Sequence, residues 1–267
     1  MRTISIALLC FAVAITAAAA DVHGAWTATT DTDTPGRVHL FITAGEWMQS
    51  GHSFDASTLA LSPGTLHATT STPVTLKLER DAGTLLFEGT FRNGDGAGQF
   101  TFTANRNYLE ALRAMGVMND LPEERSEPEQ MLGLALMDVS LDYARAIRSV
   151  FHDITLRDLR KGRAVGVTPE FIASMRQQGI EISDMHEAAR LAAVGVTVDY
   201  VRAMRAAGVH VTDAHDAVRL KAVNVTPEFV AELARAGYTN LSTRDLIRMA
   251  ATGVNGKFIR EMSKYKQ

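Results

Sequence analysis

The chain has 267 residues, a formal net charge of −3 and a hydrophobic fraction of 46%. This length suffices for two modest domains, and the balanced composition excludes a wholly disordered chain, a nucleic-acid coat and a membrane-embedded protein. The single cysteine, Cys10, lies within the first 20 residues. The rest of the sequence therefore offers no disulfide, no thiolate zinc site and no cysteine nucleophile.

Residues 1–20 have the layout of a secretory signal peptide. Arg2 precedes an apolar run from Ile4 to Ala20, and alanines occupy the two small-residue positions before a cut after Ala20. The run is shorter than the roughly 20 apolar residues that a membrane-spanning helix needs. We therefore expect cleavage after Ala20, a periplasmic or secreted location, and no stable membrane insertion once the signal peptide is removed.

Residues 21–104 predict an antiparallel β domain, because hydrophobic residues alternate with period two between frequent turn residues. The expected strands are Ala25–Thr30, Arg37–Thr43, Pro73–Arg80, Thr84–Arg92 and Gly98–Thr103. Short glycine-containing turns predict a meander for the last three strands. Its buried face should contain Leu76, Leu78, Leu85, Phe87, Phe91, Phe100 and Phe102. We expect a small β-sandwich or partial barrel, with Gly45–Thr72 as a loop or short irregular strands.

Residues 105–267 contain an internal repeat. One aromatic residue recurs at intervals of 35, 28, 29, 29 and 29 residues, at Tyr108, Tyr143, Phe171, Tyr200, Phe229 and Phe258. Each unit predicts two short helices, each with a narrow apolar stripe that it cannot bury alone. We therefore expect an α-solenoid of about five helix-pair repeats of about 29 residues, which makes the fold class α+β.

Capping residues mark the ends of these predicted helices. The first helices should begin at Thr168, Thr197 and Thr226 and end at Gly179, Gly208 and Gly237. The second helices should begin at Thr155, Ser183, Thr212 and Ser242. They should end near Gly166, Gly195 and Asn224, since glycine and asparagine tolerate a positive φ.

The two halves together resemble a known region. The hairpin sequence from Arg80 to Thr84, the segments Phe87–Gly89 and Gly96–Phe102, and the repeats of the Val-Thr-Pro-Glu-Phe type carry the resemblance. It is to an extracytoplasmic region that follows some bacterial beta-lactam-sensor-type antirepressor metallopeptidases and that also occurs in stand-alone exported proteins. The resemblance covers nearly all of residues 21–267 and implies no biochemical activity, because the His-Glu-x-x-His of the peptidase part is absent.

Cations recur at fixed positions in the repeats. One column is expected on the second helices, formed by Lys161, Arg190, Arg219 and Arg248. Another is expected on the first helices, formed by Arg113, Arg148, Arg176 and Arg205, with acids opposite at Asp142, Glu170, Asp199 and Glu228. The columns predict either ion pairs between repeats or a polar ladder that binds an acidic or peptide ligand. After Asn105 there are 22 Lys and Arg against 21 Asp and Glu, so we expect no nucleic-acid partner.

We expect neither an enzyme nor a metal or cofactor site. The segment from His186 to Arg190 has arginine where a zinc motif needs its second histidine, and His186 and His215 are expected to return to helix N-caps. The candidates for a pocket in the β domain are Trp47, His39, His52 and His67, whereas Trp26 should close the core.

These patterns predict a non-catalytic exported interaction module that binds a protein or peptide along the helical array. The alternative is an envelope sensor that binds a small amphiphile or glycan through the β domain.

Overall fold

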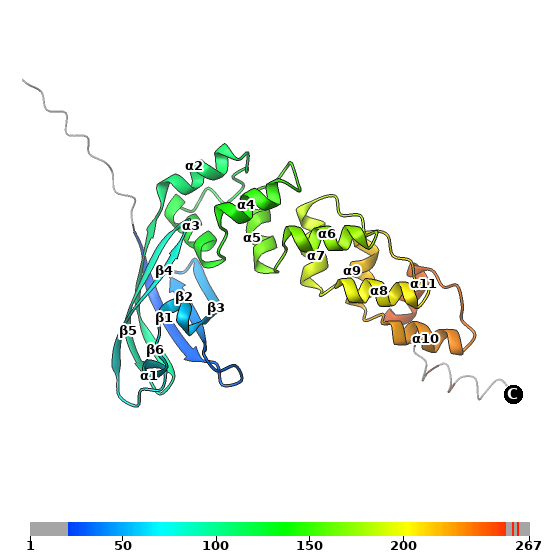
Figure 1. Ribbon diagram of the computed structural model, residues 1–267, viewed down its shortest axis with the longest axis horizontal. Helices are drawn as coiled ribbons and strands as arrows, with labels where there is room; N and C mark the ends of the chain where they lie inside the picture. Colours follow the sequence, from blue (N-terminus) through cyan, green and yellow to red (C-terminus); the bar gives the residue numbers. More distant parts are fainter. Residues whose placement is uncertain (1–20, 255–257, 259–260, 262–267) are drawn as a thin grey trace, which may run out of the picture.

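The computed structural model describes residues 21–254, 258 and 261. The expected signal peptide lies outside the described residues. The fold is α+β, with a six-stranded antiparallel sheet followed by a succession of short helices (Figure 1). None of the described helices is long and apolar enough to cross a bilayer.

All five predicted strands form, and the structure adds a sixth. The strands are β1 (Val22–Thr30), β2 (Arg37–Ala44), β3 (Met48–Asp55), β4 (Thr72–Arg80), β5 (Gly83–Arg92) and β6 (Asp95–Ala104). Their order is β3-β2-β1-β6-β5-β4. The predicted meander is confirmed as β4-β5-β6, and all seven residues of its expected inner face are buried. The segment Gly45–Thr72 holds β3, the short helix η1 (Ala56–Leu59) and α1 (Pro63–Leu66) in place of the expected loop or short irregular strands.

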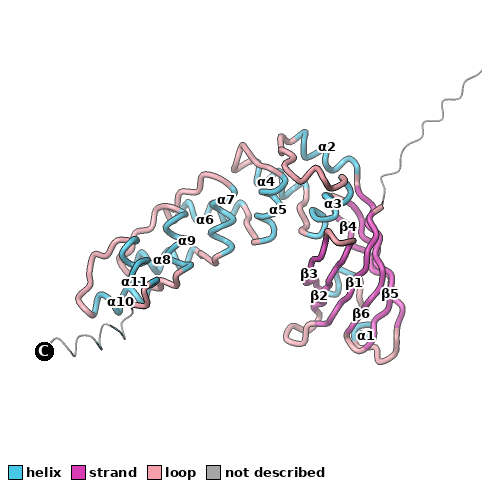
Figure 2. Tube along the Cα trace, turned by 180° about the vertical axis from the view of Figure 1, so that it is seen from behind, coloured by secondary structure: helices cyan, strands magenta, loops and turns pink. Residues whose placement is uncertain are grey.

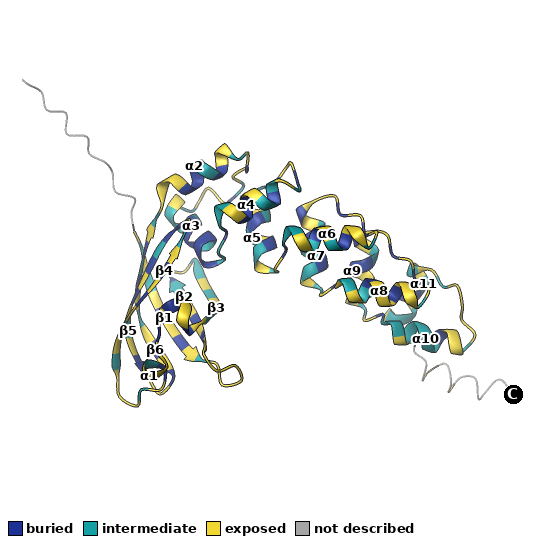
Figure 3. Ribbon diagram, in the orientation of Figure 1, coloured by how far each residue is buried: buried dark blue, intermediate teal, exposed yellow. Residues whose placement is uncertain are grey.

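The strands form one curled sheet, so of the two expected forms, a β-sandwich or a partial barrel, the two-sheet sandwich is wrong. β3 and β4 are its two edges and do not pair with each other, yet both contact η1. A single short segment reaches both edges because the sheet curls around the core that it buries. Figure 3 shows buried residues alternating with exposed ones along the strands, as expected for a sheet with one covered face.

Glycines on the inner face of the sheet make room for large aromatic rings. Trp26, which is only 1% exposed, lies where a Cβ on Gly89 would come within 2.7 Å of its Cζ2. Gly96 lies in the same way beneath Phe91, and Gly24 beneath Phe100. Each aromatic ring therefore covers a neighbouring strand that carries no side chain at that point, which lets the rings fill the curled sheet.

A succession of short helices follows the sheet, as predicted. They are α2 (Arg106–Ala114), α3 (Glu127–Leu136), α4 (Leu141–Arg148), α5 (Leu156–Ala164), α6 (Pro169–Gln177), α7 (Met185–Ala193), α8 (Val198–Ala206), α9 (Ala214–Ala222), α10 (Pro227–Arg235) and α11 (Thr243–Ala251). The predicted left-handed residues are confirmed at the helix ends: Gly166, Gly179, Gly195, Gly208, Asn224 and Gly237.

The first-helix caps are confirmed, and two second-helix caps differ from the prediction. Thr168, Thr197 and Thr226 accept the expected backbone hydrogen bonds. However, α7 and α9 are capped by Asp184 and Asp213, one residue later than the predicted Ser183 and Thr212. The second-helix caps are thus spaced by 29 residues from Thr155 to Ser242.

The corrected caps also change the role of the histidines. Position N3 of α7 is occupied by Glu187, and that of α9 by Asp216. His186 and His215 occupy the preceding position, so the expectation that they return to the caps is wrong. The carboxylate of Glu187 accepts the N–H of Ser183, the residue before the cap, at 2.8 Å.

The second helices contact one another in sequence, α5 with α7, α7 with α9 and α9 with α11, while α2 contacts α4 and α8 contacts α10 (Figure 2). The repeated tyrosine links successive pairs. Tyr108 donates its hydroxyl to the carbonyl of Val139 at 2.7 Å, and Tyr200 donates to Val225 at 2.8 Å. Burial raises the pKa of Tyr200 to about 12. The equivalent hydroxyl of Tyr143 is buried without a hydrogen-bond partner.

The sheet and the helices share one continuous core. The strands end at Ala104, where the domain boundary was predicted, but α3 packs on β1, β5 and β6 and so covers the sheet. Asp138, just beyond α3, pairs with Arg80 of β4 at 3.0 Å and with Arg163 of α5 at 2.8 Å. This carboxylate joins the sheet to the start of the helical array.

Candidate binding site

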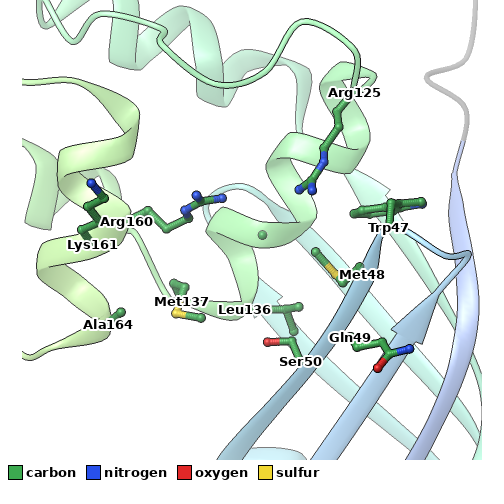
Figure 4. Close-up of a pocket in the computed structure, with 11 residues that line it drawn as sticks. Trp47, Met48, Gln49, Ser50, Arg125, Leu136, Met137, Arg160, Lys161 and Ala164 are labelled. Atoms are coloured by element: carbon green, nitrogen blue, oxygen red, sulfur yellow. The ribbon is translucent and has the colours of Figure 1, made fainter.

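A cavity of about 290 Å³ lies where the sheet meets the helices (Figure 4). Four segments form its walls: the start of β3 with Trp47 just before it, the segment before α3, the C-terminal half of α3 with Met137 just after it, and α5. The lining residues are Trp47, Met48, Gln49, Ser50, Arg125, Gly133, Leu136, Met137, Arg160, Lys161 and Ala164. Its volume is near the lower end of the range for small-ligand or peptide pockets.

Local structure positions these side chains. Gly133 presents no side chain to β3, and a Cβ there would lie 3.9 Å from the Met48 methyl, so α3 approaches the strand closely. Arg125, in the segment before α3, places its guanidinium 5.4 Å from the ring centroid of Trp47. Such a cation–π contact holds the arginine beside the cavity without neutralising its charge.

The cavity is positively charged on an apolar base. Arg125, Arg160 and Lys161 line it, and no aspartate or glutamate does. None of these three cations takes part in an ion pair with another described residue. Leu136 and Met137 supply an apolar floor. The cavity therefore favours a ligand that combines a carboxylate or another anion with an apolar part.

The predicted second-helix column does lie on neighbouring helices. Lys161, Arg190, Arg219 and Arg248 each follow their helix N-cap by six residues. Arg248 is paired with Asp245 at 2.9 Å within α11. Arg190 shares a hollow of about 150 Å³ between α7 and α9 with Asp184, His186, Glu187, Ala214, His215 and Val218. Lys161 and Arg219 form no ion pair within the described part of the chain.

The first-helix column is used within the fold. Arg176 donates to the carbonyl of Ile182 at 2.7 Å, and its guanidinium lies 5.4 Å from the ring centroid of Phe151. Arg205 donates to the carbonyl of Gln178 at the end of α6. Carbonyls at a helix end lack partners within the helix, so Arg205 satisfies a group that would otherwise need water, whereas Arg176 binds a carbonyl in the loop between α6 and α7. Arg176 and Arg205 are thus less available to a ligand than Lys161.

Among the described residues, the repeated acids form none of the ion pairs between repeats that one interpretation predicted. Asp142 pairs with Arg145, and Asp199 pairs with Arg202 at 3.4 Å, each within its own helix. The Glu170 carboxyl accepts hydrogen bonds from its own backbone N–H and from the hydroxyl of Thr168. These bonds, the first more than the second, lower the pKa of the carboxyl. The acids thus act within single helices, in their first turns.

The candidate residues of the β domain do not gather at one site. Trp26 is buried and donates its indole N–H to the carbonyl of Gln99 at 3.0 Å, so its predicted core role is confirmed. His39 contacts Ser53, whereas His52 contacts Ser50 at 2.7 Å. Burial, followed by the charge of His39, lowers the pKa of His52. No cluster of three or more potential metal ligands occurs among the described residues.

Sequence reasoning placed Lys161 in a column and missed its neighbours Arg125 and Arg160. Comparison of the chain with protein family models, with curated proteins and with solved structures gives no match. Function is therefore inferred from the sequence patterns and from the geometry of the described residues. That geometry, a cation-lined cavity at the first of the stacked second helices, is suited to binding.

Proposed function

We propose that this chain is a non-catalytic, exported interaction module. Its helix pairs form an α-solenoid of about five repeats, and it holds a protein or peptide partner along the layer of second helices. Export rests on the signal-peptide layout of residues 1–20. The resemblance to the region after antirepressor metallopeptidases supports an extracytoplasmic address.

The cavity beside Lys161 is the observation that carries this proposal. Lys161 belongs to the cavity and is also the first cation of the column that continues through Arg190 and Arg219. A partner anchored at the cavity can therefore extend over α7 and α9 and meet one cation per helix. Repeat proteins bind extended partners in this way, with one contact position per unit.

The stacking of the second helices supports the solenoid. Each has nine residues or fewer and buries only a few side chains, such as Leu191 on α7 and Leu220 on α9. Helices this short are marginal in isolation, so their stability comes from the neighbouring pair. A rigid stack keeps its exposed cations at a constant spacing.

Site-specific photo-crosslinking tests the interaction. A photoreactive residue would replace Lys161, Arg219 or, as a control, Lys77, which is exposed on β4 and remote from the array. We expect positions 161 and 219 to yield the same protein adduct in an envelope extract, and position 77 to yield none. Equal labelling at all three positions, or free monomer at all of them, would contradict the proposal.

The apolar floor of the cavity favours a second candidate, a small amphiphilic anion. Met48, Leu136 and Met137 would contact its hydrocarbon part, while Arg160 and Lys161 would bind its charge. In this alternative the protein is an envelope sensor, and its β domain takes part in binding the ligand. Decanoate at 100 times its Kd would stabilise the protein by about 2.7 kcal/mol in a thermal-shift assay. Absence of a shift at saturating decanoate would exclude this candidate.

A further inference from the structure

The edge strand β3 differs from the other described strands in that none of its eight residues is buried. It pairs only with β2. The opposite edge, β4, carries Pro73 and Lys77, two residue types that discourage the addition of a further strand. β3 has neither proline nor lysine. The sheet is thus protected at one edge and open at the other.

The cavity faces the edge of β3. Met48, Gln49 and Ser50 are consecutive and all line it. Successive side chains of a strand point to opposite faces, so a cavity on one face would touch only every second residue. Contact with three residues in a row therefore places the cavity alongside β3. Figure 4 shows the labelled side chains of β3, α3 and α5 around this space.

We propose that an extended, acidic segment of a partner protein adds to β3 as a seventh strand, with its carboxylates meeting Arg125, Arg160 and Lys161. This inference rests on the proposed function and specifies the chemistry of its partner. Backbone hydrogen bonds to β3 supply affinity that is independent of sequence, and the three cations select for acidic side chains.

The dimensions of the site fit such a segment. An added strand would lie about 4.8 Å from β3 and rise about 3.3 Å per residue, with alternate side chains on one face. Carboxylates at alternate positions would therefore point to the same side, towards α3 and α5. Apolar residues near the same end would cover Met137 and Leu136 on the cavity floor.

Charge argues against a second copy of this chain as the occupant. Pairing of β3 with β3 of another copy would bring two sets of the three cavity cations together, with no acid in either lining to offset them. Like charges placed face to face oppose association. An acidic partner removes this repulsion.

Fluorescence anisotropy with defined peptides tests the proposal on the chain from Asp21 onward. The probe is a labelled eight-residue peptide of alternating Glu and Val. The second probe has Lys in place of Glu, and two more carry N-methyl groups on the odd or the even amides. Strand addition uses the N–H groups of alternate residues, so one methylated peptide should bind at least tenfold more weakly than the parent. The Lys peptide should not bind.

A matched pair of double variants tests the cations. Arg160→Ala with Lys161→Ala should weaken binding of the Glu peptide at least tenfold. Arg145→Ala with Arg202→Ala removes the same charge from exposed positions on α4 and α8, and it should leave binding unchanged. Both pairs alter surface residues, and the methylated peptides test the same site on the unaltered protein.

Several results would overturn the inference. They are failure of the Glu peptide to bind, equal binding of both methylated peptides and the parent, or a β3-dependent dimer by size exclusion. Protein adducts at positions 161 and 219 without binding of the Glu peptide would refute this inference and leave the proposed interaction module standing.

Discussion

The close approach of β6 to the backbone of β5 at Gly98 allows a quantitative test of the sheet. Substitution of Gly98 by alanine places a Cβ against the backbone carbonyl of Glu88 and 2.7 Å from the Cα of Gly89. Both obstacles are backbone atoms of the paired strand β5, so no side-chain rotation relieves the overlap. The strands must separate locally, and the hydrogen bonds between β5 and β6 lengthen there.

The expected cost follows from this geometry. Overpacking in a well-filled core costs about 1–3 kcal/mol, and we expect the upper end because the contact is with backbone. For a protein of this size, 3 kcal/mol corresponds to a fall in Tm of roughly 6–12 °C. Urea unfolding followed by circular dichroism should show a lower midpoint with an unchanged slope, since the surface exposed on unfolding stays the same.

Gly64 in α1 provides the matched control. A Cβ there would lie 3.8 Å from its nearest neighbour, the hydroxyl oxygen of Ser62, which is ordinary contact. Gly64→Ala should therefore be neutral or stabilise by about 0.4–1 kcal/mol, because it restricts the unfolded chain. A Gly98→Ala protein as stable as the wild type would refute the packing described for the inner face of the sheet.

Three further predictions concern the joints between elements. Tyr200→Phe should lower the free energy of unfolding by about 1–3 kcal/mol in chemical denaturation, because it leaves the buried carbonyl of Val225 unpaired. Tyr143→Phe removes a hydroxyl that has no hydrogen-bond partner, so it should be neutral or stabilising. Asp138→Asn should lower the free energy of unfolding by about 1 kcal/mol, since it removes the charge that pairs with the partly exposed Arg80 and Arg163. An unchanged unfolding midpoint would show that these two ion pairs do not stabilise the fold. Burial lowers the pKa of His52 in the folded state, so stability should fall as pH drops below about 6.5, where the unfolded chain takes up a proton more readily than the folded chain. If the free energy of unfolding is measured between pH 8 and 5, His52→Gln should reduce its fall at the acidic end. The same pH dependence in the variant and the wild type would show that His52 is not the cause of the fall.

Local chemistry made most of the fold predictable. Hydrophobic alternation and glycine turns located five strands, and the positive-φ glycines located the helix ends. The two misplaced caps have a physical explanation: Ser183 and Asp184 are adjacent, and either side chain is a good N-cap. Local preference does not separate them, whereas the 29-residue spacing from Thr155 does.

The candidate site was harder to predict because it depends on contacts between distant segments. Trp47, Arg125 and Arg160 are far apart in the sequence and meet only when α3 packs on the sheet. Their individual surroundings give no periodic signal. β3 was also missed as a regular strand, since its serine, glycine and histidine residues form no buried alternation, and that same composition leaves its edge exposed.

The cover that α3 forms over the sheet sets an order of events during synthesis. The aromatic inner face is complete in sequence at Ala104, but its cover begins only at Glu127. A nascent chain therefore carries an uncovered apolar surface until α3 has emerged from the ribosome or crossed the translocation channel. Any factor that slows the chain between these two points prolongs the interval in which aggregation competes with folding.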